Sequence, residues 1–499
     1  MKVTLIEPNI ISRTFNSTIA ASLPLGIAYL SSYLLFRGID VQVIDAIGEG
    51  INNFSFIKKN YLSWGLSNNS ILQQIDKKTS IIGITINHSC QHNIVLNLVK
   101  SIKKLFVNIP IVIGGLHGSE SYVDFLENGV DYVVLGEGEQ TFYDLCYSLK
   151  NKLSLDDVKG IAYKKNNTII NTEKRPPIKD LNSLPFPARS LFPLNNYFNS
   201  KLMHSPVNHN NSPILSSRGC SHKCSFCSIP VYWKGVWRGR NPRNIVAEIE
   251  SCKKMYDIKE FHFMDDDMLF HKKRIIDFCK LLCKRNLQIS WSGSTGLRSE
   301  NIDDEMLFWM KKSGCNLIAL SPESGSQRIL KNVYNKKIDL NHIRTIIKKS
   351  NDLGIISTAY FVIGSDTETE NDRLLTKNYI KSLAKNGLDE AGIFVLMAHP
   401  NTPLSLNMYN NKKNVKEWED LVQGTVPISH KKHSYLKKYK TKLYLHFYFT
   451  QLIYHPSKIF RIIKNFILRK QETKTDRVLL SYIKTFFKIH LYPNKIMNK

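Results

Sequence analysis

Three cysteines stand close together near the middle of the chain. Cys220, Cys224 and Cys227 are separated by three and then by two residues. Soft thiolates select zinc or iron–sulfur centres. Structural zinc takes four ligands, and its cysteines usually come as two closely spaced pairs. His222 could supply a fourth ligand, but its place inside the loop is a poor spacing for that role. Three thiolates on one short loop instead suit three irons of a four-iron four-sulfur cube, whose fourth iron stays open to a substrate or cofactor.

The other cysteines are predicted to be structural. Cys279 and Cys283 lie four residues apart on an expected helix and could ligate a second metal, but packing as small core residues is their more ordinary role. The same interpretation holds for Cys90, Cys146, Cys252 and Cys315. Nine cysteines in 499 residues are too sparse for a disulfide scaffold, and the odd number argues against full pairing. We therefore expect a cytoplasmic protein.

The cysteine loop directly follows the first strand of a regular strand–helix alternation. The expected strands are Ile214 to Ser217, Glu260 to Met264, Ile289 to Ser292, Leu317 to Leu320, Thr358 to Ile363 and Ile393 to Met397. A helix is expected between each strand and the next. Six such units in about 185 residues predict a partial (β/α)6 barrel of the TIM type, with its site at the carboxyl ends of the strands.

The first 150 residues predict a separate α/β domain. Short apolar runs alternate there with helical stretches, which is typical of a parallel, Rossmann-like (flavodoxin-like) sheet covered by helices on both faces. Ligands of such sheets bind at the carboxyl ends of the strands. Glycines cluster at two of these ends, where they let the backbone approach a ligand closely: Gly114, Gly115, Gly136 and Gly138.

Two further regions are expected to differ from these αβ units. Residues 151 to 210 read as a linker with a hairpin across Asn166-Asn167, followed by several prolines that oppose regular structure. Residues 406 to 499 read as a basic, mainly helical extension. From Asn411 to Lys499 there are 20 basic and 5 acidic residues, within a chain whose net charge is +27.

The basic extension suggests attraction to an anionic partner, although it could also be an ordinary solvated surface. Ile459 to Leu468 alternates apolar and basic residues at helical spacing, so peripheral membrane contact stays open, although such a stripe more often packs on its own protein. No nucleic-acid module is recognisable, so nucleic acid is not expected. No run of about 18 apolar residues predicts a spanning helix, and Met1 to Asn9 reads as a strand rather than a signal peptide.

The cysteine spacing, on a loop after the first strand of such a barrel, resembles the radical S-adenosylmethionine (SAM) superfamily. In that family the three cysteines hold a [4Fe-4S] cluster, and the open iron chelates S-adenosylmethionine. An electron from the cluster splits a carbon–sulfur bond, which gives methionine and a 5′-deoxyadenosyl radical. The resemblance implies that Cys220, Cys224 and Cys227 are the cluster ligands.

Other segments resemble the same family and imply residues that bind S-adenosylmethionine. Phe226 matches the aromatic position beside the adenine. Asp265, in the run Met264 to Asp267, stands where family members place polar groups near the methionine amine, although three adjacent carboxylates could also bind a metal or cap the next helix. Glu323 and Ser324 match a segment that approaches the ribose. Gly364 ends the strand that lies along the adenine, but the Pro-Gly that often follows in relatives is lost here.

The N-terminal region resembles the cobalamin-binding domains that are fused to radical SAM barrels. The resemblance rests on Leu23 to Leu30, Gly114 to His117 and Gly136 to Glu139. It implies a cobalamin site formed by Gly114, Gly115, His117, Gly136 and Gly138. The Asp-x-His-x-x-Gly motif that supplies a cobalt ligand is absent, because Asn87-His88-Ser89-Cys90 lacks its Asp and Gly. Cobalamin would then bind without a lower protein ligand, unless the domain is purely structural.

Together the resemblances predict a four-part iron–sulfur enzyme. The parts are a cobalamin-binding-like domain (1–150), a linker (151–210), a radical SAM barrel (211–405) and the basic extension (406–499). The expected cofactors are a [4Fe-4S] cluster, S-adenosylmethionine and cobalamin, and the expected partners are a small-molecule substrate and an electron donor such as flavodoxin or ferredoxin.

The predicted activity is cleavage of S-adenosylmethionine and cobalamin-dependent methylation of an unactivated carbon or phosphorus. The first alternative is an anaerobic oxidative cyclase of the porphyrin-ester type. The second is a non-enzymatic binding protein that senses cobalamin or the cluster. Methylthiolation of transfer RNA is disfavoured, because relatives of that kind carry three further cysteines near the N-terminus.

Overall fold

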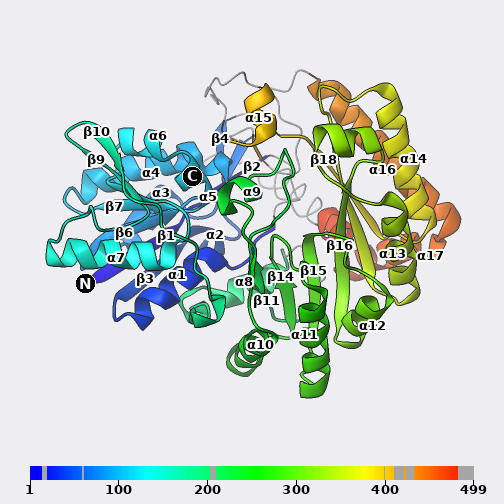
Figure 1. Cartoon of the computed structure of the whole chain (residues 1–499), viewed down its shortest axis with the longest axis horizontal. Coiled ribbons are helices and arrows are strands. Elements are labelled where there is room, and N and C mark those ends of the chain that lie inside the picture. The colour runs from blue at the N-terminus through cyan, green and yellow to red at the C-terminus, as the bar shows by residue number, and fades with distance from the viewer. Residues whose placement is uncertain are drawn as a thin grey trace.

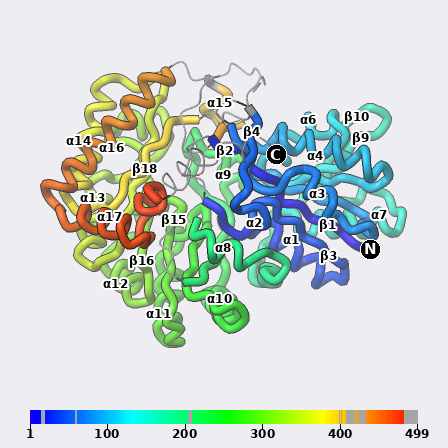
Figure 2. The backbone as a smooth tube through the Cα atoms, turned by 180° about the vertical axis from the view of Figure 1, so that it is seen from behind, coloured from blue at the N-terminus to red at the C-terminus, as the bar shows by residue number. Residues whose placement is uncertain are grey.

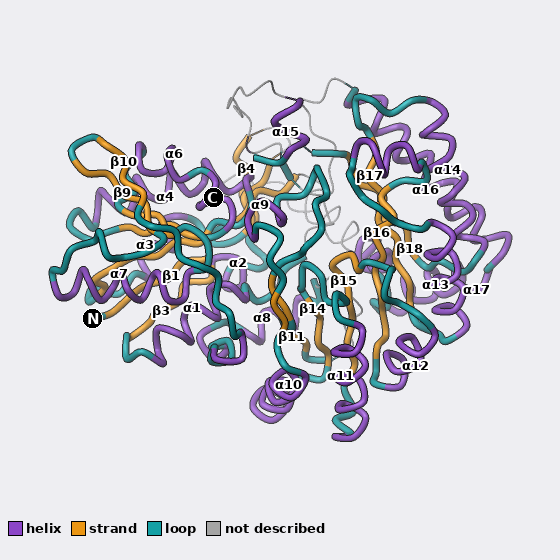
Figure 3. The backbone as a smooth tube through the Cα atoms, viewed as in Figure 1, coloured by secondary structure: helices purple, strands orange, loops and turns teal. Residues whose placement is uncertain are grey.

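Two α/β bodies lie side by side, with helices of the C-terminal region against the second one (Figure 1). The computed structural model describes residues 1–13, 20–58, 61–202, 209–397, 399, 401–408, 418, 421–422 and 432–480. In both bodies the strands are flanked by helices (Figure 3). The α/β class, with a Rossmann-like sheet followed by a partial barrel and a helical C-terminus, is confirmed.

The N-terminal sheet has seven strands in the order β10-β9-β8-β7-β6-β1-β3. Their bounds are β1 (Lys2–Glu7), β3 (Asp40–Asp45), β6 (Thr79–Thr85), β7 (Ile111–Gly114), β8 (Tyr132–Val134), β9 (Ile161–Lys165) and β10 (Thr168–Asn171). The first five along the chain are parallel, and their spatial order is the flavodoxin-like 2-1-3-4-5. The hairpin predicted in the linker is β9–β10, which extends this sheet through β8.

Helices cover both faces of the N-terminal sheet. They are α1 (Leu25–Phe36), α2 (Ala46–Glu49), α3 (Asn68–Gln74), α4 (His92–Leu105), α5 (Leu116–Glu120), α6 (Tyr122–Glu127) and α7 (Gly138–Asn151). Successive side chains of a strand point to opposite faces. Accordingly Leu5 packs in the core on one face of β1, and Ile6 packs in a separate core on the other. This double burial explains why the strands read as continuous apolar runs.

A small antiparallel sheet beside this body was not predicted. It consists of β2 (Ile10–Arg13), β5 (Tyr61–Trp64) and β4 (Phe54–Lys58), in that order. Trp64 is buried in it and donates from its indole nitrogen to the Ile51 carbonyl at 2.9 Å. Its short strands are separated in sequence and carry no alternating pattern, so no local signal marks them.

The barrel wall is a six-stranded parallel sheet in chain order. Its strands are β11 (Asn211–Ile214), β14 (Glu260–Phe263), β15 (Ser290–Leu297), β16 (Cys315–Glu323), β17 (Ile356–Ile363) and β18 (Glu390–Val395). The intervening helices are α10 (Pro242–Tyr256), α11 (Lys272–Arg285), α12 (Asp304–Lys312), α13 (Leu340–Asp352) and α14 (Glu370–Lys385). The first strand ends earlier than predicted, and a separate ribbon of β12 (Ser217–Arg218) and β13 (Arg238–Gly239) follows it.

Short helices connect these parts, and two longer ones follow the barrel. The connecting helices are α8 (Leu194–Ser200), α9 (Ile229–Trp233) and α15 (Pro403–Met408). The later pair, α16 (His433–Tyr454) and α17 (Pro456–Leu468), lies on the outer side of the barrel (Figure 2). Residues 409–417, 419–420, 423–431 and 481–499 of the predicted basic extension lie outside the described residues. Within the described ranges, every helix is too short or too polar to cross a membrane.

Candidate functional site

The cysteine loop leaves β12 and is held at both ends by hydrogen bonds. Gly219 adopts a φ of 89°, and its N–H donates to Asp266 Oδ2 at 3.1 Å. A Cβ at this position would lie 2.0 Å from the Val236 carbonyl oxygen, so only glycine fits. Further along, the Ser225 N–H donates to the Tyr334 carbonyl at 3.0 Å. The loop is therefore fixed against the segments that follow β14 and β16.

The three cysteines of the loop differ from most others in exposure. Cys220, Cys224 and Cys227 are half-buried, whereas five of the remaining six cysteines are buried, and all nine are free thiols. Partial burial raises the pKa of Cys220 to about 11 and that of Cys227 to about 12, and it also raises the pKa of Cys224. Coordination to a metal deprotonates such thiols outright. The loop thus offers three reachable sulfur donors.

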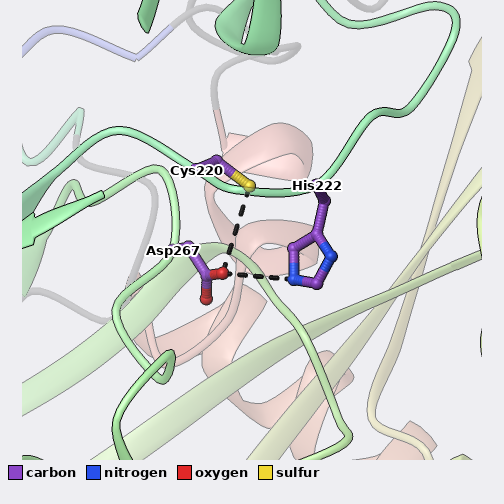
Figure 4. Close-up of side chains that lie close together, drawn as sticks. All are labelled: Cys220, His222 and Asp267. Atoms are coloured by element: carbon purple, nitrogen blue, oxygen red, sulfur yellow. Dashed lines mark hydrogen bonds and ion pairs between the residues drawn. The ribbon is translucent and has the colours of Figure 1, made fainter. Parts of the chain in front are cut away.

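A second set of possible ligands includes only one of these sulfurs. Cys220, His222 and Asp267 come together beside the loop (Figure 4). Asp267 Oδ2 lies 3.4 Å from His222 Nε2 and 4.0 Å from Cys220 Sγ. Among the described residues, no other three such donor atoms all lie within 4.8 Å of one another.

This trio could hold one zinc ion with an open fourth position, but it leaves two thiols unused. The three cysteine sulfurs do not form a set of this kind, so they are not gathered at the distances of a single ion. A cube does not require them to be so close, because each sulfur binds a different iron. The donor set therefore fits an iron–sulfur cluster better than it fits one zinc ion.

The three carboxylates after β14 have separate partners. Asp265 is buried and accepts hydrogen bonds from the Ser216 N–H at 3.0 Å, from Ser216 Oγ at 2.6 Å and from Ser217 Oγ. Asp266 holds the glycine that opens the cysteine loop, and burial raises the pKa of Asp266 to about 6. Asp265 thus anchors the chain that leads into the loop, and its contact with a methionine amine stays a prediction.

Glu323 and Ser324 lie at the carboxyl end of β16 in a buried polar network. Glu323 has a φ of 62°, which is uncommon outside glycine, and its carboxylate pairs with Lys336 Nζ at 2.8 Å. Ser324 Oγ lies 3.1 Å from Thr376 Oγ1 and accepts from the Ser326 N–H. Strained backbone of this kind persists where the surroundings enforce it, often at functional sites. Lys336 was not singled out from the sequence.

Phe226 and Gly364 also lie near the carboxyl ends of the barrel strands. The Phe226 ring meets Tyr334 edge-on, with centroids 5.2 Å apart. Gly364, at the end of β17, has a φ of 91°, and its N–H donates to Glu368 Oε2 at 3.1 Å. Glu368 belongs to the retained Glu-Thr pair, so this pair shapes the backbone after the strand. The role of both residues at an adenine stays a prediction.

A cavity of about 310 Å³ runs along the carboxyl edge of the N-terminal sheet. It lies over β1 and β6, at the point where the strand order reverses, which is where sheets of this class bind ligands. All four predicted glycines line it: Gly114, Gly115, Gly136 and Gly138. Gly115 has a φ of 93°, and a Cβ there would lie 2.6 Å from the Ile86 carbonyl oxygen.

The opposite wall of this cavity comes from the barrel side. It includes Ser217, Arg218, Tyr232 and Asp266, which lie next to the cysteine loop. Ligand pockets range from about 300 to 1,000 Å³, so the enclosed space accepts part of a large cofactor. Glycine backbone and apolar strand residues make up most of its other lining, which fits a bulky, largely uncharged group such as a corrinoid.

His117, predicted as a further cobalamin residue, does not line the cavity. Its imidazole is buried, with Nε2 at 2.9 Å from His92 Nδ1 and Nδ1 at 3.2 Å from Ser89 Oγ. His92 in turn contacts Asp124 through its other nitrogen. Burial and the neighbouring His92 lower the pKa of His117 to about 3. The structure therefore brings the four glycines together and places His117 in an imidazole pair.

A buried cluster of ion pairs joins the two bodies beside the cavity. Arg218 donates to Glu137 at 2.7 Å and to Glu139 at 2.6 Å, and Arg238 donates to Glu137 at 2.7 Å. All four side chains are 11% exposed or less. Pairing of β12 with β13 sets the two arginines opposite each other. No role was predicted for these residues, although Arg218 stands just before the cysteine loop and the two glutamates lie in the run Gly136 to Glu139.

Comparison with known protein families agrees with this two-part arrangement. Residues 214–380 match the radical SAM superfamily, and residues 21–146 match the B12 binding domain. A solved structure of the cobalamin-dependent S-adenosylmethionine radical enzyme OxsB, with aqua-cobalamin and S-adenosylmethionine bound, superposes with a TM-score of 0.67 at 17% identity. The match covers 99% of this chain and 79% of that one. At this identity the likeness shows the fold.

Three curated relatives are similar over much of their length. An uncharacterized methyltransferase of Pyrococcus horikoshii is 28% identical over 90% of this chain and 92% of that protein. Cytidylyl-2-hydroxyethylphosphonate methyltransferase of Streptomyces wedmorensis is 27% identical over 68% of each. Anaerobic magnesium-protoporphyrin IX monomethyl ester cyclase of Rubrivivax gelatinosus is 29% identical over 74% of this chain and 63% of that enzyme.

Proposed function

We propose that this chain, which belongs to the radical SAM superfamily and carries an N-terminal B12-binding domain, methylates an unactivated carbon or phosphorus atom of a small molecule. Cys220, Cys224 and Cys227 would hold a [4Fe-4S] cluster, and the four glycines of the cavity would receive cobalamin. S-adenosylmethionine would bind among Phe226, Asp265, Glu323, Ser324 and Gly364. When bound, these cofactors supply the reductive cleavage of S-adenosylmethionine and the transfer of a methyl group.

One observation carries the proposal: the cysteine loop and the glycine-lined cavity share a wall. Arg218 lines the cavity and stands two residues before Cys220. Its ion pairs with Glu137 and Glu139 connect the loop to the segment that holds Gly136 and Gly138. These contacts would hold the two candidate cofactor sites in a fixed relation, which favours consecutive reactions at neighbouring positions.

Methyl transfer is supported by the Pyrococcus and Streptomyces relatives, both of which are named as methyltransferases. The cyclase of Rubrivivax, at a similar 29% identity, supports oxidative cyclisation of a porphyrin ester as the second candidate. Either reaction of this chain would depend on the cysteine loop, so the loop does not separate them. We propose a flavodoxin or ferredoxin as the electron donor in either case.

The test is anaerobic reconstitution of the full chain with iron, sulfide and cobalamin, followed by reduction in the presence of methyl-labelled S-adenosylmethionine. We expect bound iron and corrinoid, formation of 5′-deoxyadenosine, and label recovered on the protein-bound corrinoid. Protein that holds no iron and cleaves no S-adenosylmethionine would refute the proposal. Conversion of magnesium-protoporphyrin IX monomethyl ester without incorporation of label would establish the cyclase instead.

A further inference from the structure

Helix α17 presents large apolar side chains to its surroundings. Phe460, Ile463 and Ile467 are 64%, 50% and 71% exposed. Their spacing of three and four residues places them on one side of the helix. Asn465 is the one residue of this helix that is fully buried. Nothing in the described part of the chain covers this apolar side.

Three polar side chains of α17 face the protein instead. Lys458 and Arg461 both pair with Asp389 Oδ1, at 2.8 and 2.9 Å, and Asn465 donates to Asp476 Oδ2 at 3.0 Å. Asp389 is only 3% exposed, so rotating the helix would leave a buried carboxylate unpaired, which is strongly unfavourable. A helix on a water-facing surface normally buries its apolar stripe and exposes its charges. Helix α17 has the reverse orientation, and its ion pairs lock it there.

The second half of α16 continues the apolar surface. It packs on α14 and α17, and its exposed apolar residues follow one another at helical spacing. These residues are Leu445, Phe449, Leu452, Ile453 and Tyr454. Figure 2 shows both helices on the outer side of the barrel. Large exposed apolar surfaces of this kind mark interaction sites in soluble proteins.

The charge around this surface has one sign. Residues 433–468 contain seven lysines and arginines but no aspartate or glutamate. Lys442, Lys464, Arg469 and Lys470 are exposed on or next to the two helices. A second copy of this chain would bring the same positive charge to the contact. An anionic bilayer offers both a hydrocarbon boundary for the apolar side chains and phosphates for the cations.

We propose that the apolar faces of α16 and α17 form a docking surface for an anionic lipid membrane. The apolar side chains enter the boundary between headgroups and acyl chains, and the flanking lysines and arginines meet the headgroups. The stripe seen in the sequence is therefore a membrane-facing stripe rather than a core-facing one. This binding does not depend on the chemistry at the cysteine loop, so it can succeed or fail independently of the proposed methyl transfer.

The test is co-sedimentation of the full chain with vesicles of phosphatidylcholine, with and without phosphatidylglycerol. We expect binding to the anionic vesicles that weakens with salt, and binding to neutral vesicles that is about tenfold weaker or more. The double variant Ile463→Glu/Ile467→Glu should lose about tenfold or more of the affinity for anionic vesicles. It replaces two apolar side chains that would enter the bilayer with negative charges that the anionic headgroups repel.

The matched control is Leu105→Glu/Val107→Glu, two residues that are 65% and 70% exposed beside the N-terminal sheet. It adds the same charge and should bind vesicles as the wild type does. Unchanged binding of the α17 variant, or equal binding to both kinds of vesicle, would overturn the proposal. A wild-type dimer that the α17 variant dissociates, without vesicle binding, would assign the surface to a second copy. If the chain bound vesicles only after removal of residues 481–499, the occupant of the apolar surface in the full chain would be this terminal segment and not a membrane, which would also overturn the proposal.

Discussion

The two walls of the candidate site are built in opposite ways. The cysteine loop contributes side chains, and its chemistry depends on three sulfur atoms at fixed places. The edge of the N-terminal sheet contributes the absence of side chains, because four glycines leave room along the strand ends. The first wall should therefore be sensitive to the loss of a single atom. The second should be sensitive to the gain of one, and variants of each kind can test this difference.

The largest effect is expected from removing one sulfur. Cys224→Ala should abolish cluster binding and cleavage of S-adenosylmethionine, because a cube with two protein ligands is not held. Iron content and 5′-deoxyadenosine measure these two properties. The control is Cys252→Ala, which removes a buried thiol from α10 at a cost of about 1 kcal/mol in stability. Equal iron content in the two variants would mean that the loop is not the metal site.

The next effect is expected where the two walls meet. Arg218→Gln leaves Glu139 buried without its cation, and breaking such a pair costs about 3–5 kcal/mol. The variant should keep its iron and still cleave S-adenosylmethionine. The amount of methylated product per 5′-deoxyadenosine should fall about tenfold or more, because reacting groups that are misplaced react slowly even when both cofactors are bound. Arg243→Gln, on the exposed side of α10, is the control. If the methylated product and 5′-deoxyadenosine fell together, the loss would indicate general unfolding and not misplacement of the two sites.

A smaller effect is expected from adding one carbon to the glycine-lined wall. Gly136 and Gly129 have φ values of 89° and 94°, and a Cβ at either would meet no atom within 4 Å. Alanine at either position costs about 1–2 kcal/mol of backbone strain. Only Gly136 lines the cavity. Gly136→Ala should therefore weaken corrinoid binding about tenfold while Gly129→Ala does not, with iron content equal in both. Equal corrinoid affinities would place the cofactor elsewhere.

The features that could be predicted from sequence are local. The cysteine spacing and the glycines at strand ends each lie within a few residues, and periodicity gives the strands and helices around them. The ion pair between Arg218 and Glu137 joins residues 81 positions apart, and no pattern within either segment specifies it. The orientation of α17 likewise depends on a carboxylate in another element, Asp389. Long-range pairs of this kind follow from the packing of the two bodies.

Adjacent residues can also separate in ways that a motif does not show. Asp265, Asp266 and Asp267 read as one acidic group, but each of them has a different partner. His117 shows the same effect, since it stands two residues after the cavity-lining Gly115 and yet lies outside the cavity lining. Sequence neighbours share a loop but need not share a site.

The smallest effect concerns this histidine. His117→Gln should cost about 1–2 kcal/mol of unfolding free energy at about pH 7.5, through the hydrogen bonds to His92 and Ser89. The folded protein lowers the pKa of His117 to about 3. Below about pH 6.5 the unfolded chain therefore binds a proton at this imidazole that the native state does not bind. The free energy of unfolding of the wild type consequently falls by up to about 1.4 kcal/mol for each pH unit. The variant has no imidazole at this position, so its free energy of unfolding does not show this fall.

The stability difference between wild type and His117→Gln should consequently narrow as the pH falls from about 7 to about 5. Chemical unfolding at the two pH values measures it. A cobalt ligand would behave differently, because its removal would change the spectrum of the bound corrinoid. An unchanged spectrum together with a narrowing difference would support a structural role for His117 and a glycine-lined wall that contributes only room for the corrinoid. A changed spectrum would show that the N-terminal body contributes a side chain to the cofactor as well.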